Sequence, residues 1–517
     1  IYEMHVRDFS IDKSGNFCYK GRFLAFVEKG VINAAGDKIG IDHLKELGVT
    51  HVHLMPSFDY QTVDETRLNV PQFNWGYDPQ NFNCPEGSYS TNPYDGRARV
   101  AEFKRLVHAL HCQGIRVIMD VVYNHTYATA DSPFNKIFNK YYYRLWGENG
   151  EYFSNGSGCG NEIATERFMV RKYIIDSLVY WATEYKIDGF RFDLMGLYDI
   201  ETMNKIDETL HAINPDIILY GEGWIGGDSP LADSKRAMKL NARHTPNIAF
   251  FSDDFRDTIK GNNFENRSRG YVNGATGSEE YVKEVMCGRI PHPQIPNLTK
   301  FAWTLSPCQT VNYVEAHDNL TLWDKLIYTN PTDSLDTRKK MDKMAAACVF
   351  LAQGIPFIQA GQDFLRSKPL PGGAYDHNSY NSPDAVNSLK WDRKSEFRDV
   401  FDYYKGLIEF RKAHSALRMF TAEDIGRNMK FFDHLPQRIV GFGLYGDCEL
   451  EEIIVFFNPT NDDITLHAFG EYNVYIDGDN AGNKPLYTVC DDYIIKPHST
   501  MVMGRPYPKP EEEEAAE

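Results

Sequence analysis

The segment Gly189-Phe-Arg-Phe-Asp193 is a short apolar run that carries an arginine and an aspartate on the same face of a predicted strand. Similar runs recur at 2–6, 49–54, 115–122, 217–221, 248–251, 311–315 and 356–360. They alternate with longer amphipathic segments at 100–111, 167–185, 337–351 and 396–412. Such alternation is typical of a parallel sheet, and eight strands are the number that a closed barrel needs. The sequence therefore predicts an α/β protein with a (β/α)8 TIM barrel.

The remaining segments indicate how the chain is organised around this barrel. We expect a barrel domain over residues 1–420, with one long loop at 126–166 and another at 252–302. From about residue 421 the helical pattern stops, and short alternating runs predict a small all-β C-terminal sandwich over 421–508. The acidic end, 509–517, is predicted to be disordered.

Composition excludes several classes of function. The 517 residues carry a formal charge of −17, which disfavours a nucleic acid partner. No run of about 18 apolar residues is present, so the sequence predicts no membrane segment. The nine cysteines form no Cys-x-x-Cys pair, which argues against structural zinc and suggests a reducing cytoplasm or an anaerobic habitat. The sequence does not begin with Met and its first residues lack a signal core, so we expect a fragment, and its location, cytoplasmic or extracellular in a bacterium, stays open.

Acidic and basic residues follow the ends of four predicted strands. They are Asp120 with Asn124 and His125, Arg191 with Asp193, Glu222, and His317 with Asp318. A single aspartate in such a place is often only a helix cap, and Glu222 between two glycines could occupy a turn. Because the carboxyl ends of barrel strands meet at one face, however, the set as a whole predicts an active site.

Three carboxylates at one face of the predicted barrel, Asp193, Glu222 and Asp318, are suited to glycosyl transfer. A retaining mechanism needs a nucleophilic carboxylate and an acid/base carboxyl about 5–5.5 Å apart. Asp193 and Glu222 lie on consecutive predicted strands, and Arg191 would keep Asp193 ionised. Asp318 could support the positive charge of the transition state, and His125 and His317 could donate hydrogen bonds to the sugar.

The segment Phe73-Asn-Trp-Gly-Tyr-Asp-Pro79 follows the second predicted strand. We interpret Trp75 and Tyr77 as exposed aromatic rings on which a sugar stacks. The alternative is a loop that packs as a plug on the top of the barrel.

These motifs resemble those of the α-amylase clan, glycoside hydrolase family thirteen, and are most similar to the type I pullulanases, which debranch starch. The clan pieces are Asp120-Val-Val-Tyr-Asn-His125, Gly189-Phe-Arg-Phe-Asp193, Gly221-Glu222 and Glu315-Ala-His-Asp-Asn319. The pullulanase-like pieces are Asn74-Trp-Gly-Tyr-Asp-Pro79, Tyr220-Gly-Glu-Gly-Trp224 and Asn319-Leu-Thr-Leu-Trp-Asp-Lys325. The resemblance covers nearly the whole chain.

The resemblance implies a role for individual residues. Asp193 would be the nucleophile, Glu222 the acid/base and Asp318 the stabiliser of the transition state. The residues expected to bind substrate are Tyr77 as the stacking platform, Trp75, Asp120, His125, Arg191, Trp224, His317 and, from the segment 378–384, Asn381.

The chain departs from the family pattern in places. Phe73 stands where pullulanases commonly have Tyr, and we expect that the carbohydrate-binding modules that usually precede the barrel are missing from this fragment. The partner expected is an α-glucan oligo- or polysaccharide. No cofactor is expected to be required. Asn124 matches an amylase calcium position, but debranching enzymes often lack that site, so calcium stays possible and no metal ligand is assigned.

Three functions stay open. The first is hydrolysis of α-1,6 branch links in pullulan, starch or limit dextrins. The second is a related activity of the same clan, namely isoamylase-like debranching of glycogen, α-1,4 amylase action or branching transfer. The third is a non-catalytic glucan-binding homologue.

Overall fold

The computed structural model describes residues 1–296, 302–467 and 470–508. The predicted acidic tail, 509–517, and part of the second predicted long loop, 297–301, lie outside the described residues. In the part of the chain that is described, no helix is long and apolar enough to cross a membrane.

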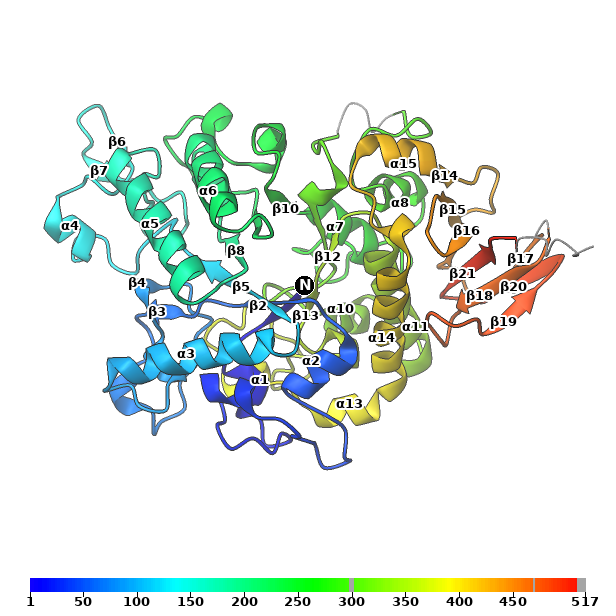
Figure 1. Ribbon diagram of the computed structural model, residues 1–517, viewed down its shortest axis with the longest axis horizontal. Helices are drawn as coiled ribbons and strands as arrows, with labels where there is room; N and C mark the ends of the chain where they lie inside the picture. Colours follow the sequence, from blue (N-terminus) through cyan, green and yellow to red (C-terminus); the bar gives the residue numbers. More distant parts are fainter. Residues whose placement is uncertain (297–301, 468–469, 509–517) are drawn as a thin grey trace, which may run out of the picture.

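A parallel barrel occupies most of the described chain (Figure 1). Its strands pair in the order β12-β11-β10-β9-β8-β5-β2-β1-β13, and every neighbouring pair is parallel. Their bounds are β1 Tyr2–Met4, β2 His51–Leu54, β5 Arg116–Val121, β8 Gly189–Phe192, β9 Ile218–Gly221, β10 Ala249–Phe251, β11 Thr310–Asn312, β12 Ile355–Pro356 and β13 Ile358–Gln359.

The last two segments close the barrel. Only Phe357 separates β12 from β13, and its amide donates to the oxygen of Asn312 at 2.9 Å. Since β12 pairs with β11 and β13 pairs with β1, the two segments act as one interrupted eighth strand. This confirms the predicted TIM barrel.

Helices surround the barrel, and each of the four long predicted ones is present within a few residues of its expected bounds. The longer helices are α3 Gly96–His111, α5 Phe168–Glu184, α6 Ile200–Ile213, α11 Leu335–Leu351 and α14 Arg398–Ala413. The shorter ones are α1 Asp8–Ile11, α2 Ile41–Leu47, α10 Leu322–Thr329, α12 Asp384–Asn387 and α13 Asp392–Glu396. Side-chain caps mark several N-termini, since Asp95 accepts from the amide of Arg97, and Ser334 accepts from that of Thr337.

The two predicted long loops contain short elements. After β5 come α4 Pro133–Ile137, β6 Leu145–Trp146 and β7 Tyr152–Phe153, and after β10 come α7 Asp253–Lys260 and α8 Glu279–Met286. A further hairpin, β3 Phe58–Tyr60 with β4 Pro79–Pro85, follows β2. All of these extend the connections that leave the carboxyl ends of barrel strands, where barrel enzymes build their sites.

Aromatic residues fill much of the barrel. Tyr220, Phe251, Tyr313 and Phe357 form a buried group whose rings meet mainly edge to face, with centroids 5.1–6.2 Å apart. Part of the aromatic content of the sequence is therefore core packing rather than sugar binding.

The C-terminal part is antiparallel. A six-stranded sheet has the order β14-β15-β16-β21-β18-β19, and β17 pairs separately with β20. The bounds are β14 Met429–Phe431, β15 Val440–Tyr445, β16 Leu450–Asn458, β17 Ile464–His467, β18 Tyr472–Ile476, β19 Tyr487–Val489, β20 Asp492–Ile495 and β21 Ser499–Pro506. Apolar side chains from both sheets, including Ile454, Phe456 and Ile495, share one core. These antiparallel sheets agree with the predicted sandwich.

One helix was not predicted here. α15 spans Ala422–Asn428, directly after the point where the helical pattern was expected to stop. Only Ile425 is buried in it, and Thr421 caps it by accepting from the amide of Asp424. So short a helix with one buried residue leaves no apolar periodicity in the sequence.

Candidate active site

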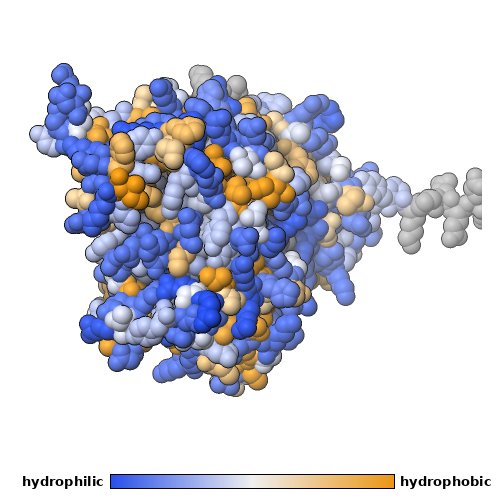
Figure 2. All heavy atoms as spheres, turned by 60° about the vertical axis from the view of Figure 1, so that its left-hand side comes forward, coloured by the Kyte–Doolittle hydropathy of each residue, from blue (hydrophilic) through white to orange (hydrophobic). Residues whose placement is uncertain are grey.

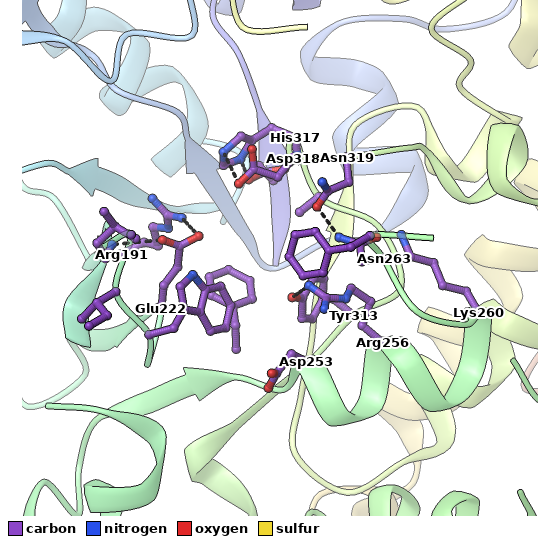
Figure 3. A pocket seen from close by; sticks show the side chains of 18 residues that line it. Arg191, Glu222, Asp253, Arg256, Lys260, Asn263, Tyr313, His317, Asp318 and Asn319 are labelled. Carbon is purple, nitrogen blue, oxygen red and sulfur yellow. Dashed lines mark hydrogen bonds and ion pairs between the residues drawn. The ribbon is translucent and has the colours of Figure 1, made fainter. Parts of the chain in front are cut away.

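A cavity of about 520 Å³ opens at the carboxyl ends of β8, β9 and β11 (Figure 3). Arg191 and Glu222 line it on one side, and Arg256, Lys260 and Asn263, from α7 and the turn after it, lie on the other. His317 and Asp318 lie between these two sides. The strand ends thus bring predicted residues from separate parts of the sequence into one pocket.

Arg191 is the electrostatic centre of this pocket. Its side chain is buried, and Nη1 lies 2.9 Å from Oδ1 of Asp120 and 2.9 Å from Oδ1 of Asp193. Nη2 lies 2.8 Å from Oε1 of Glu222. One guanidinium group therefore bridges the predicted nucleophile and the predicted acid/base. Buried charges of this kind are tolerated because each is paired and hydrogen-bonded.

Glu222 has the electrostatics of an acid. Burial raises the pKa of its carboxyl to about 7, with Arg191 opposing the shift and the negative charges of Asp193 and Asp318 adding to it. The amide of Leu194 donates to Oε2 of Glu222 at 3.0 Å. Leu194 reaches this carboxylate in a left-handed conformation with φ of 39°, which is uncommon for a residue other than glycine.

Asp193 is held by Asn124 as well as by Arg191. The Asn124 amide donates to the Asp193 backbone oxygen at 2.8 Å and to Oδ2 at 2.7 Å. The amide oxygen of Asn124 contacts Nδ1 of His125, whose Nε2 lies 2.9 Å from the backbone oxygen of Tyr77. His125 is buried, and burial lowers its pKa. Asn124 and His125 thus connect the predicted nucleophile to the aromatic loop.

Two carboxylates near His317 favour the protonated form of its imidazole. Its backbone amide and its Nδ1 each lie 2.7 Å from a carboxylate oxygen of Glu3, and Nε2 lies 3.7 Å from Oδ2 of Asp318. Burial lowers the pKa of His317, but Glu3 and Asp318 together raise it to about 9. The Tyr77 ring stacks on the imidazole with centroids 5.0 Å apart and an interplanar angle of 23°.

Asp120 lies behind the pocket wall. It is fully buried, and its carboxylate accepts from Tyr77 Oη at 2.8 Å and contacts His53 Nε2 at 3.1 Å. Burial raises the pKa of Asp120, but Arg191 and His53 lower it to about 2. This carboxylate orients Tyr77 and Arg191, and Arg191 lines the pocket.

The aromatic loop is only partly exposed. We expected an open ring at Trp75, and the structure corrects this, because Trp75 is 5% exposed and packs edge-on against His317 at 4.9 Å. Its amide also donates to the backbone oxygen of Tyr380 at 2.9 Å. The plug alternative therefore describes Trp75, while Tyr77 is half-buried. Trp224 lines the cavity, and Asn381 is exposed and outside the described cavity lining.

Several residues of the site were missed by reasoning from sequence. Glu3 and His53 sit inside β1 and β2, where they look like ordinary polar residues of short strands. The alternation of inward and outward side chains along each strand could have identified them, because a polar residue at an inward position of a barrel needs a partner. The Leu194 amide carries no sequence signal at all.

A possible metal-binding group lies elsewhere. Among the described residues, Asp59, Glu65 and Glu86 place carboxylate oxygens within 4.8 Å of one another. Arg99 already forms ion pairs with Asp59 and Glu65, so a cation is present in this group. None of these residues lines the catalytic cavity.

Comparison with known proteins shows which family the chain is similar to. Residues 19–146 match the family model for the α-amylase catalytic domain. The chain is 41% identical over 471 residues to the pullulanase of Bacillus subtilis (strain 168), covering 90% of this chain and 63% of that protein. The chain therefore spans less than two thirds of that relative.

Solved structures agree over nearly the whole chain. The pullulanase of Bacillus acidopullulyticus superposes with a TM-score of 0.91 and 43% identity, covering 98% of this chain and 60% of that one. A mutant of the Paenibacillus barengoltzii pullulanase, complexed with maltotetraose, gives 0.90 and 42%, covering 98% of this chain and 77% of that one.

Proposed function

Since the chain belongs to the α-amylase family and, within it, to the pullulanases, we propose that it hydrolyses α-1,6-glucosidic branch linkages with retention of configuration. The substrates are pullulan, starch or derived limit dextrins. The observation that carries the proposal is the single buried guanidinium of Arg191, which joins Asp193 to a Glu222 whose pKa is about 7. This pairing places the Asp193 carboxylate beside an acid that can be protonated near neutral pH.

In the first step, Asp193 attacks the anomeric carbon of the glucose at the branch. The bond from this carbon to the glycosidic oxygen breaks, and the Glu222 carboxyl gives its proton to that oxygen. The product is a glucosyl ester on Asp193 and a free chain. Arg191 keeps both carboxylates in place as the negative charge moves from Asp193 to Glu222.

In the second step, water attacks the same carbon. Glu222, now ionised, takes the proton from the water, and the ester bond to Asp193 breaks. Asp318 faces the pocket with 55% of its side chain exposed, so it is free to stabilise the positively charged transition state through the hydroxyls of the ring. Tyr77 supplies the aromatic wall for the same ring, backed by His317.

The branch specificity rests on the relatives. The Paenibacillus barengoltzii pullulanase was solved with maltotetraose and maltotriose, which are α-glucan chains. A pocket that combines aromatic rings with charges paired to one another, in a chain of charge −17, suits an uncharged sugar.

The test is the product profile on pullulan. The protein should release maltotriose, and Asp193→Asn and Glu222→Gln should each lower kcat by at least about a thousandfold. Asp216→Asn, at an exposed aspartate before β9, is the matched control and should keep full activity. Intact pullulan with shortened linear amylose would contradict the α-1,6 assignment, and cleavage of glycogen alone would favour isoamylase-like action. Binding without turnover would show a non-catalytic homologue.

Members of this family need no organic cofactor. We propose that the reaction needs no calcium either, because Asn124, at the amylase calcium position, commits its amide group to Asp193 and His125. Dialysis against EDTA should leave kcat on pullulan unchanged. A loss of kcat that added Ca²⁺ restores would refute this proposal.

A further inference from the structure

A second groove, of about 590 Å³, is lined by β4 and by residues between 126 and 134. We call it the β4 groove, and its walls include Gln61, Gln80, Asn81, Tyr127, Phe134 and Tyr173. The elements that form it, β3, β4, α4 and α5, lie at the left of Figure 1. This side comes forward in Figure 2, where hydrophobic side chains form separate patches on a largely hydrophilic surface.

The same two chain segments build the β4 groove and the catalytic site. Tyr77 lies three residues before Gln80, and His125 lies two residues before Tyr127. The amide of Tyr127 donates to the backbone oxygen of Pro79 at 3.0 Å, which ties the two segments together. Because a residue advances the chain by at most about 3.6 Å, Gln80 lies within about 11 Å of Tyr77 along the backbone. The two segments therefore carry residues of the groove close to Tyr77 and His125 of the candidate site.

The groove offers groups that the protein itself does not use. In the described part of the chain, the side chains of Gln61 and Gln80 have no hydrogen-bond partner, and Asn81 uses only its amide nitrogen, on Asp59. The Tyr127 side chain is 54% exposed and makes no ring contact or hydroxyl hydrogen bond with the described residues. Neutral amides beside a free aromatic face match the hydroxyls and the apolar face of a sugar ring.

The charges of the groove are already neutralised. Asp59 lies 3.4 Å from Arg99, and Asp131 lies 3.5 Å from Lys136. An anionic ligand would find no unpaired cation among the described residues of the groove, and the charge of −17 would repel it. The ligand that fits is therefore polar and uncharged.

We propose that the β4 groove is an auxiliary binding site for a neutral α-glucan chain, which it holds while a branch point occupies the catalytic pocket. The identity of the sugar rests on the proposed function. The groove adds binding energy that is present in both the ground state and the transition state, so it lowers KM for long chains without changing kcat.

The experiment uses the double variant Gln80→Ala/Tyr127→Ala in the full chain. Tyr281→Ala is the matched control, because Tyr281 on α8 is 60% exposed and lines neither cavity. KM and kcat are measured on pullulan and on a hexasaccharide with a single α-1,6 link. KM on pullulan should rise about fivefold to tenfold in the double variant, the range that about 1–1.4 kcal/mol produces. The hexasaccharide constants and kcat should not change, and the control should match the original protein.

A second measurement is independent of activity. Calorimetric titration with linear maltoheptaose is carried out on Glu222→Gln with and without the two groove substitutions. Weaker binding on loss of Gln80 and Tyr127 supports the site. Unchanged maltoheptaose binding together with an unchanged KM on pullulan overturns it. If the protein leaves pullulan intact but the groove substitutions weaken maltoheptaose binding, the proposed function is contradicted and the groove is still supported as a glucan-binding site.

Discussion

Replacing Glu3 by Gln removes the negative charge that holds His317 in its protonated form. The pKa of His317 is about 9 against an ordinary value of 6.5, a difference that corresponds to about 3 kcal/mol of folding free energy. Because the folded-state pKa is the higher one, this stabilisation is fully present below pH 6.5 and is lost as the pH rises through about 9. In Glu3→Gln, burial lowers the pKa of His317, and Asp318, 55% exposed, is screened by water and compensates only in part.

The assay is the free energy of unfolding by urea at several pH values from about 6 to 9.5. The original protein should lose about 1.4 kcal/mol per pH unit through this group between pH 6.5 and 9, and Glu3→Gln should lack most of that slope. Asp363→Asn is the control, since it removes another buried carboxylate, 3.3 Å from His43, whose pKa burial lowers rather than raises. An equal slope in Glu3→Gln and the original protein would refute the reasoning.

The other predictions concern the carboxylate pair. Because Glu222 must be protonated to act as an acid, kcat/KM on pullulan should fall as the pH rises through about 7, and a profile flat from about pH 6 to 8 would contradict that role. In Gly221→Ala, the new Cβ would lie 2.5 Å from the backbone oxygen of Phe192, the last residue of β8. Strand β9 must then shift, and kcat should fall about tenfold or more. The control is Gly96→Ala, which has open space around its Cβ and should have no effect on kcat. Asn124→Ala removes two hydrogen bonds to Asp193, and kcat should fall by about ten- to a hundredfold with little change in KM; a rise in KM alone would show that Asn124 acts in binding.

The barrel was predictable because its signal is local and repeated. Each strand is a short apolar run bounded by turns, and a run such as residues 189–193 needs no distant information to be recognised. The seventh strand shows the limit, since it was expected to reach residue 315 and ends at Asn312. Beyond that point the amide of His317 binds the Glu3 carboxylate rather than a neighbouring strand, a contact across 314 residues that no local pattern encodes.

For the candidate site too, some features could be predicted from the sequence and others could not. Residues at strand ends, such as Asp193 and Glu222, were found because topology alone places strand ends together. The exposure of Trp75 was mistaken, since a ring is buried or open according to what covers it, and here His317 and Tyr380 come from remote segments. The pKa values of about 7 and about 9 likewise depend on burial and on neighbours that only the folded chain brings together.

The register of three neighbouring strands places Asp193 and Glu222 side by side. In the ladder from β5 through β8 to β9, Asp120 lies opposite Arg191, and Phe192 lies opposite Gly221. One residue further, Asp193 and Glu222 therefore leave adjacent strands side by side, and adjacent strands are about 4.8 Å apart. That spacing is close to the separation of about 5–5.5 Å that a covalent glycosyl intermediate requires, whereas inverting enzymes need roughly 6.5–9.5 Å for an intervening water. The proposed retention of configuration is consistent with Asp193 and Glu222 at the ends of consecutive strands, where Arg191 contacts both carboxylates.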